Sequence, residues 1–306
     1  MAIAFVFPGQ GSQSVGMLAE LASEGAQIND RLRQASQIID ENLVELVSNG
    51  PPARLNQTEI TQPAILASSI GLFDLFLERG GEAPTCMAGH SVGEYSALVA
   101  AGALGFEDGV RIVHERGRLM QLAVPMGQGS MSAVLGLDDE RVGEICAETQ
   151  GTVAPANFNA PGQVVIAGQT ESVAAAGEAC KAAGARRVLP LDVSVPSHCL
   201  LMEPAAVGLA GLLETIAIKR PTVPVYQNVD GAPSIEPAQI RENLIAQVKV
   251  PVLWTHCILT MIQDGATDFY ECGPGKVLAG LMRRIDRSAS VVALSDFVAF
   301  NAALSK

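Results

Sequence analysis

The sequence has few of the residues that build metal sites, disulfide scaffolds and nucleic-acid surfaces. Its four histidines and six cysteines are scattered, with no C-x-x-C pair and no histidine at ligand spacing from a cysteine, which argues against zinc and against a secreted disulfide framework. Its 20 lysines and arginines form no phosphate-tracking cluster and are outnumbered by 32 acidic residues. We therefore expect no metal, no nucleic-acid partner and a location in the reducing cytoplasm.

Signal and membrane segments are missing as well. The first residues, MAIAFVFPG, carry no basic stretch and stop at Pro8, so they predict a buried strand and not a signal peptide. No uninterrupted apolar stretch is long enough to span a bilayer, and no membrane partner is expected. The composition is 48% hydrophobic over 306 residues, which is enough for a large core, and this length suggests two domains.

Strand and helix patterns alternate through most of the chain, which favours a mostly parallel sheet covered by helices. Outside residues 126–196, the patterns predict strands at 1–7, 86–88, 223–227, 267–270 and 291–294. They predict helical stretches up to residue 46 and helices at 62–79, 94–103, 106–122, 200–215, 237–247, 252–263 and 276–285.

A shorter unit with a different order follows a Gly/Pro cluster at 125–129. Its patterns predict strands at 131–135, 152–157, 164–167 and 187–191, with helices at 138–149, capped by Asp138, and at 170–183, capped by Thr170. The order βαββαβ is that of the ferredoxin-like split unit. We therefore predict a small ferredoxin-like subdomain at 126–196, inserted into a large α/β domain formed by 1–125 and 197–306.

The most informative motif is GHSVG at 89–93, between an apolar run and a helical pattern. This is the layout of a nucleophile elbow, in which a sharp strand-to-helix turn holds a serine hydroxyl at the edge of a sheet. Gly89 and Gly93 stand where a side chain would block the close approach of strand and helix. An ordinary structural turn is the alternative. If the elbow forms, Ser91 carries covalent acyl chemistry.

A serine nucleophile needs a base, which at neutral pH is usually a histidine. His198 is the strongest candidate, because it ends the segment SVPSH where the chain leaves the small subdomain and a cleft can form. His90 is expected to pack or hydrogen-bond beneath the elbow. His114 is expected to be solvated or salt-bridged, and His256 to lie in the core or on a helix face.

The group that orients the base is not an obvious acid. About a hundred residues follow His198, which is not the ordinary hydrolase order, and Asp192 is too near it along an extended segment. A backbone carbonyl or an amide in the region of Gln247 is the alternative. For the oxyanion hole, the candidate donors are the backbone N–H of Val92 and the loop around Gln10.

Arg116 lies on the helix that follows the elbow helix. It is either a surface arginine or a residue whose planar guanidinium points into the cleft and grips a carboxylate with two hydrogen bonds. The residue by itself does not decide between the two.

Six motifs in a fixed order resemble one known family. They are FPGQGSQ at 7–13, TQPA at 61–64, GHSVGEYSA at 89–97, RGRLM at 116–120, VPSH at 195–198 and PVLW at 251–254. Together they resemble the malonyl-CoA:acyl carrier protein transacylases of dissociated fatty acid synthesis. The resemblance implies a hydrolase-like, mostly parallel α/β core with an inserted ferredoxin-like subdomain.

The resemblance also implies a ping-pong reaction, in which Ser91 takes the malonyl group from malonyl-CoA as an ester and yields it to the phosphopantetheine thiol of acyl carrier protein. It implies that His198 acts as base and then as acid, oriented by the main-chain carbonyl of Gln247. The backbone amides of Gln10 and Val92 would form the oxyanion hole.

The same resemblance assigns the residues that surround the acyl group. Arg116 would bind the malonyl carboxylate, Gln62 and Met120 would line the acyl pocket, and Asn157 would lie on the small-subdomain side of the cleft. No cofactor is implied, because CoA and the carrier protein are substrates. Ser197 stands where related polyketide domains that choose malonyl often have Phe, which leaves methylmalonyl as an alternative.

Two different functions stay open beside the transfer reaction. A serine esterase or thioesterase would use the same Ser91 and His198 with water as acceptor, and a catalytically silent protein would only bind the carrier. The pathway could make fatty acids or polyketides. We expect a monomer, although no pattern decides the oligomeric state. Because carrier proteins are acidic, docking requires a local basic patch, for which the candidates are Lys181, Arg186, Arg187, Lys276, Arg283, Arg284 and Arg287.

Overall fold

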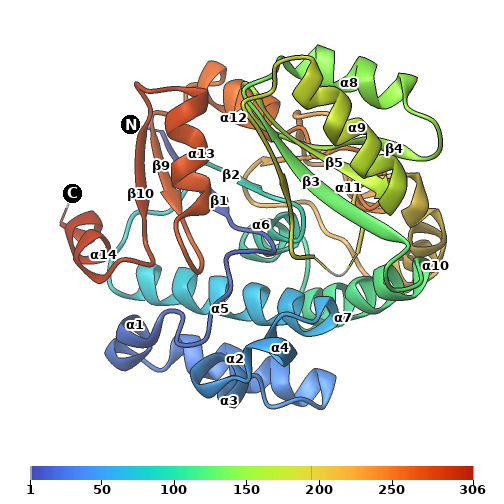
Figure 1. Ribbon diagram of the computed structural model, residues 1–306. Helices are drawn as coiled ribbons and strands as arrows, with labels where there is room; N and C mark the ends of the chain where they lie inside the picture. Colours follow the sequence, from blue (N-terminus) through green and yellow to red (C-terminus); the bar gives the residue numbers. More distant parts are fainter. Residues whose placement is uncertain (1, 194, 306) are drawn as a thin grey trace.

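The computed structural model describes residues 2–193 and 195–305 and contains two sheets (Figure 1). The larger sheet has the order β10-β9-β1-β2-β7-β8. Its strands are β1 (Ile3–Phe7), β2 (Cys86–Gly89), β7 (Val225–Tyr226), β8 (Pro233–Ser234), β9 (Asp268–Glu271) and β10 (Ser290–Ala293). All neighbours pair in parallel except β7 and β8. The mostly parallel α/β core is therefore confirmed.

Strand β1 is central and buried on both faces. Phe5 and Phe7 belong to the hydrophobic core on one face, whereas Ala4 and Val6 belong to the core on the other, because successive side chains of a strand point to opposite sides. The first core includes residues of α5 (Thr58–Glu78), α6 (Gly93–Ala100) and α7 (Phe106–Ala123). The second includes residues of α12 (Trp254–Gln263) and α13 (Val277–Ile285).

The remaining helices of the larger unit complete its outer layer. Helix α2 packs across α5 and α7, and with its neighbours it forms the layer below α5 in Figure 1. The helices that complete the outer layer of the larger unit are α1 (Ala19–Glu24), α2 (Gln27–Ile39), α3 (Leu43–Asn49), α4 (Pro52–Leu55), the 3-10 helix η1 (Leu200–Met202), α10 (Glu203–Glu214), α11 (Pro237–Gln247) and α14 (Phe297–Leu304).

The smaller sheet has the order β4-β5-β3-β6 and is antiparallel throughout. Its elements are β3 (Gly129–Leu135), α8 (Asp139–Glu148), β4 (Val153–Ala160), β5 (Gln163–Gln169), α9 (Thr170–Ala182) and β6 (Arg187–Pro190). This is the ferredoxin-like order expected from the sequence, and Asp138 caps α8 as predicted. All these elements fall inside the predicted range 126–196, although the division into domains at its ends stays a prediction.

The segment just before α12 is bound to β4 of the smaller sheet by backbone hydrogen bonds. Val252 pairs with Asn157 of β4, its N–H donating to Ala156 and its carbonyl accepting from Phe158, both at 2.9 Å. The helix predicted from residue 252 therefore begins only at Trp254, because Val252 uses its backbone groups in this bridge.

Helix α5 begins at Thr58, four residues before the predicted start. Pro63 lies inside the helix and has no N–H, so the carbonyl of Glu59 lacks its intrahelical donor. The ring Nδ1 of His114 lies 2.9 Å from that carbonyl and supplies the missing hydrogen bond. The prediction of a solvated or salt-bridged His114 is therefore wrong.

Helix α5 is long and apolar enough, by length and composition alone, to cross a membrane, although polar residues such as Glu59, Gln62 and Asp74 interrupt its apolar sequence. However, 89% of the apolar window is buried inside the fold. It is the central core helix in this structure.

Three smaller predictions also differ from the structure. Thr170 is the first residue of α9, not its cap, since Gln169 is the N-cap and the Thr170 hydroxyl donates to the carbonyl of Gly127 at 2.8 Å. Strand β8 was not predicted, because two residues are too few to show the alternation of apolar and polar side chains that indicates a strand. Helix α14 was not predicted, because its sequence, FVAFNAAL, is apolar on nearly every side and lacks the polar face that indicates an amphipathic helix.

The turn between β2 and α6 brings strand and helix into direct contact. A Cβ on Gly89 would lie 1.9 Å from the carbonyl carbon of Gly93, and a Cβ on Gly93 would lie 2.1 Å from the carbonyl oxygen of Phe7. Both obstacles are backbone atoms, which cannot move aside like a flexible side chain. The two glycines therefore let α6 start directly against β1 and β2.

We expect Gly93→Ala to lower the free energy of unfolding by about 3 kcal/mol, because an added methyl in a packed backbone contact forces the helix away from β1. Gly143→Ala is the matched control. Gly143 lies in α8, and a Cβ there would have no atom within 4 Å, so alanine should be neutral or stabilising by up to about 1 kcal/mol. Urea unfolding measures both, and equal stability of the two variants would contradict the contact.

Candidate active site

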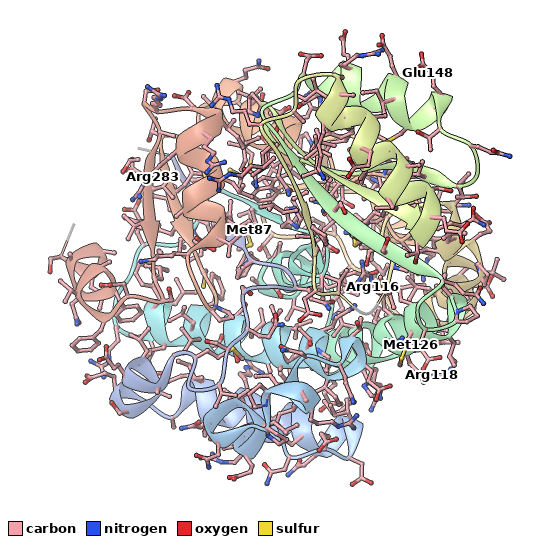
Figure 2. All side chains as sticks on the ribbon, viewed as in Figure 1. Met87, Arg116, Arg118, Met126, Glu148 and Arg283 are labelled. Carbon is pink, nitrogen blue, oxygen red and sulfur yellow. The ribbon has the colours of Figure 1, made fainter. Side chains whose placement is uncertain are left out.

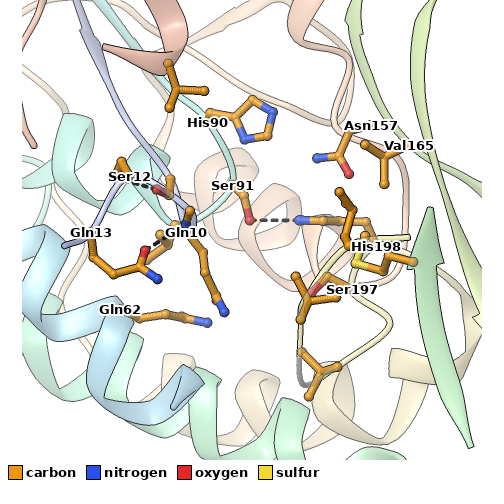
Figure 3. A pocket seen from close by; sticks show the side chains of 18 of the residues that line it. Gln10, Ser12, Gln13, Gln62, His90, Ser91, Asn157, Val165, Ser197 and His198 are labelled. Atoms are coloured by element: carbon orange, nitrogen blue, oxygen red, sulfur yellow. Dashed lines mark hydrogen bonds between the residues drawn. The ribbon is translucent and has the colours of Figure 1, made fainter. Parts of the chain in front are cut away.

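Ser91 and His198 are joined by a hydrogen bond. Ser91 Oγ lies 2.7 Å from His198 Nε2 (Figure 3), and His198 Nδ1 lies 2.7 Å from the main-chain carbonyl oxygen of Gln247. Because a carbonyl only accepts, Nδ1 carries the ring proton and Nε2 is free to accept the proton of the serine hydroxyl. The structure thus places together a serine hydroxyl, an imidazole nitrogen that can accept its proton, and a carbonyl that orients the imidazole.

His198 is held uncharged by its surroundings. Its exposed fraction is 2%. Burial first, and then the positive charge of Arg116, lower the pKa of His198 to about 3, against the opposing effect of the Gln247 carbonyl. The neutral imidazole is the form that can accept a proton from Ser91.

Arg116, labelled in Figure 2, is buried, with 1% of its surface exposed, and its guanidinium lies beside the Ser91 hydroxyl. Its guanidinium donates to Gln62 Oε1 at 2.9 Å, to Gln247 Oε1 at 3.1 Å and to Ser91 Oγ at 3.3 Å. Over residues 2–193 and 195–305, no carboxylate forms a salt bridge with it, and its Nε has no hydrogen-bond partner. A buried cation with only neutral partners favours an anionic ligand.

A cavity of about 260 Å³ opens in front of Ser91. Gln10, Gln62, Val92, Met120 and Asn157 line it, together with Ser91, His198 and Arg116, and Figure 3 shows the labelled side chains around it. Gln247 lies behind the cavity wall, fully buried, and reaches the site through its hydrogen bonds. The structure therefore brings together the residues that the family resemblance assigned to catalysis and to acyl binding.

The other candidates for base and orienting acid have different positions. His90 packs edge-on against Trp254, with ring centroids 5.4 Å apart, and its Nε2 lies 2.8 Å from Asn159 Oδ1, as expected for a residue that supports the elbow. His256 is exposed on α12. Asp192 borders the cavity, but the carbonyl of Gln247 occupies the orienting position at His198.

Two buried residues next to the elbow were missed. Asn228 accepts a hydrogen bond from the backbone N–H of Ser91 at 2.7 Å, and Glu94 accepts one from the backbone N–H of Asn228 at 2.7 Å. Burial raises the pKa of the Glu94 carboxyl to about 8. The available signal was the position of Asn228 just after a strand that pairs with the elbow strand, since carboxyl ends of parallel strands meet at one edge of a sheet.

Comparison with known proteins agrees with this geometry. A family model described as acyl transferase domain matches residues 4–295. The malonyl CoA-acyl carrier protein transacylase of Salmonella typhimurium is 51% identical over 305 residues, which cover 99% of each chain. The chain belongs to this transacylase family. The family expected from the six motifs is therefore confirmed.

Solved members of the transacylase family share the fold. A malonyl-transacylase in complex with its type II polyketide synthase acyl-carrier protein has a TM-score of 0.98 at 48% identity, covering 100% of this chain and 99% of that chain. An acyl carrier protein S-malonyltransferase of Vibrio cholerae has a TM-score of 0.96 at 48% identity, covering 99% of both chains. The hydrolase-like core with an inserted ferredoxin-like unit is thus the fold of the family.

We expect the buried neutral His198 to make the protein less stable in acid. Its folded-state pKa of about 3 lies below the usual 6.5, so between these values the unfolded chain binds the extra proton and stability falls as the pH falls. From pH 7 to pH 5 this amounts to about 2 kcal/mol. Urea unfolding of the wild type and of His198→Gln measures it, because the variant should lose less stability.

His256→Gln is the control for that measurement, since His256 is exposed. Its stability should follow the wild type over the whole pH range. Parallel curves for the wild type and His198→Gln would show that His198 titrates alike in the folded and unfolded states.

Proposed function

We propose that the protein transfers the malonyl group of malonyl-CoA to the phosphopantetheine thiol of acyl carrier protein through an ester on Ser91. The observation that carries the proposal is the buried Arg116 guanidinium, 3.3 Å from the Ser91 hydroxyl and without a carboxylate partner among the described residues. Family membership supports the same reaction, because the relatives named above are malonyl transacylases. All six cysteines are free and buried, which suits the cytoplasm as its location.

In the first half-reaction, Ser91 Oγ attacks the thioester carbonyl carbon while its proton passes to His198 Nε2. The C–S bond then breaks, and the CoA sulfur leaves with the proton returned by His198. The imidazolium is the acid of this step, and its proton neutralises the leaving thiolate. The products are the malonyl ester of Ser91, free CoA and neutral His198.

In the second half-reaction, the carrier thiol gives its proton to His198 and its sulfur attacks the ester carbonyl. The C–O bond breaks, and Ser91 Oγ recovers the proton. Each half-reaction passes through a tetrahedral oxyanion. Gln10 and Val92, the N-cap of α6, line the cavity, and we assign their backbone N–H groups as the oxyanion donors.

The acyl group is selected at the Arg116 end of the cavity. In the proposal, the malonyl carboxylate accepts hydrogen bonds from the guanidinium, which is placed by Gln62 and Gln247. Met120 lies beside Gln62, whose Nε2 is 3.7 Å from the Met120 sulfur, and so bounds the acyl pocket. Asn157 lines the opposite side, on β4.

The carrier protein would dock beside α13, despite the net charge of −12. Arg284 of α13 donates to Gln163 of β5, and Gln163 pairs with Leu135 of β3, which in turn pairs with Arg187 of β6. Arg284 and Arg187 therefore border the same end of the smaller sheet, and we assign them to one docking surface. Val277 and Leu281 of α13 also line the cavity. Lys181 is paired with Glu178. Among the described residues, the other candidates have no salt bridge: Arg186, Arg187, Lys276, Arg283 (Figure 2), Arg284 and Arg287.

Mixing the protein with malonyl-CoA should give a malonyl adduct in the intact mass, absent from Ser91→Ala. Adding acyl carrier protein should discharge the adduct onto the carrier thiol. Release of free malonate without any carrier would instead indicate a thioesterase. No adduct and no turnover would leave only a binding function.

Arg116→Ala should lower kcat/KM for malonyl-CoA relative to acetyl-CoA, since a carboxylate buried without its partner costs roughly 3 to 5 kcal/mol. The ratio should therefore fall by two orders of magnitude or more. Arg118→Ala is the matched control, because Arg118 lies on the same helix but is half exposed and paired with Glu115. Equal losses for malonyl and acetyl substrates would remove Arg116 from the carboxylate site.

A further inference from the structure

The nucleophile has a backbone conformation that its own sequence does not favour. Ser91 has a φ of 53°, in the left-handed region. For a residue with a Cβ, this conformation costs roughly 1 to 2 kcal/mol and persists only where surrounding contacts hold it. Contacts from outside the elbow must therefore stabilise the turn.

Two buried amide side chains supply those contacts. The backbone N–H of Ser91 donates to Asn228 Oδ1 at 2.7 Å, and the backbone carbonyl of Ser91 accepts from Gln247 Nε2 at 3.1 Å. Asn228 Nδ2 also donates to the carbonyl of Gly89 at 2.7 Å. One asparagine side chain thus binds the chain on both sides of His90 and bridges the turn from strand to nucleophile.

Asn228 is itself fixed in place by its main chain. Its N–H donates to Glu94 Oε2 at 2.7 Å, and its carbonyl accepts from Leu253 at 2.9 Å. It follows closely after β7, which pairs with β2, and it is fully buried. The side chain therefore cannot turn away without breaking hydrogen bonds in a site closed to water.

Only a side chain with both a donor and an acceptor fits these partners. The Gly89 carbonyl requires a donor, and the Ser91 N–H requires an acceptor. Aspartate would keep the acceptor but set a charged oxygen against the carbonyl of Gly89, and alanine would leave both groups unpaired. An unpaired buried polar group costs about 1 to 3 kcal/mol.

We propose that Asn228 is a positioning residue for the acyl transfer, which holds the Ser91 backbone in its left-handed conformation and so aims the hydroxyl at His198. The inference rests on the proposed function. Asn228 does not line the cavity, so it acts on the nucleophile and not on the substrate. Its loss should slow attack on any acyl group equally and leave KM for malonyl-CoA nearly unchanged.

The test is single-turnover acylation of the full chain by malonyl-CoA and by acetyl-CoA, followed by intact mass. The rate constant reports how well Ser91 is positioned, whereas the amplitude reports how much protein is folded. For Asn228→Ala we expect the rate constant to fall about 100-fold for both substrates, as for a small misplacement of a reacting group. Asn243→Ala is the matched control, a buried asparagine of α11 that does not touch the elbow.

The Asn228→Asp variant adds a second measurement, the pH dependence of the acylation rate, which would not change if Asn228 had only a structural role. When its carboxyl is protonated it regains a donor for the Gly89 carbonyl, so lowering the pH from 8 to 6 should restore the rate relative to the wild type, by up to about tenfold per pH unit. The groups facing this position are Glu94 from α6, Cys257 from α12, Asp230 close by in the same loop and, beyond Gln247, Arg116 from α7. Glu94 acts most directly, since a second carboxyl beside it favours the protonated form of the introduced side chain, which is the form that donates to Gly89.

The outcomes separate this inference from the proposed function. A wild-type rate constant in Asn228→Ala, with or without a smaller amplitude, would overturn the inference and leave the transfer intact. Loss for malonyl alone would also overturn it. Labelling of Ser91 by a small fluorophosphonate measures nucleophile positioning without any malonyl chemistry. If the wild type were labelled but formed no malonyl adduct, the proposed function would fail while the labelling rates still tested Asn228.

Discussion

A positive charge buried beside a serine hydroxyl is the constraint on which the rest of the site depends. Removing a guanidinium from water costs several kcal/mol unless its donors are satisfied. Here the terminal nitrogens of Arg116 donate to neutral oxygens of Gln62, Gln247 and Ser91, so these side chains must keep fixed orientations, while its Nε has no partner among the described residues. The same charge acts on the base, since it adds to burial in lowering the pKa of His198. One buried cation therefore fixes the side chains around it and, after burial, contributes most to keeping His198 neutral.

Gln247 connects the parts of the site through both its main chain and its side chain. It is the last residue of α11, where carbonyl groups lack intrahelical partners and carry the negative end of the helix dipole, so its carbonyl can accept from His198 and stabilise the imidazolium that forms in the reaction. Its side-chain amide binds Arg116 on one side and the Ser91 backbone on the other. This explains why no acid follows the serine as in ordinary hydrolases.

The features that follow from local sequence were predictable, and those that depend on long-range pairing were not. The elbow and the βαββαβ unit follow from turn glycines, caps and periodicity. The burial of Arg116 does not, because RGRLM has the same pattern on a surface helix as on one packed under a cleft. Asn228 meets Ser91 across 137 residues, through the pairing of β7 with β2. His114 finds its partner only because Pro63 leaves the carbonyl of Glu59 without a donor.

In the proposed reaction, the malonyl carboxylate would also tune the base. Arg116 is the second-largest cause of the low pKa of His198, after burial. A carboxylate paired with the guanidinium would cancel much of that charge as seen from the imidazole, so the pKa of His198 should rise when malonyl is bound. An acetyl group has no carboxylate and would leave the base as weak as before. Selection for malonyl would then act on proton transfer from Ser91 as well as on binding, because the substrate that satisfies Arg116 is the one that makes His198 a better base.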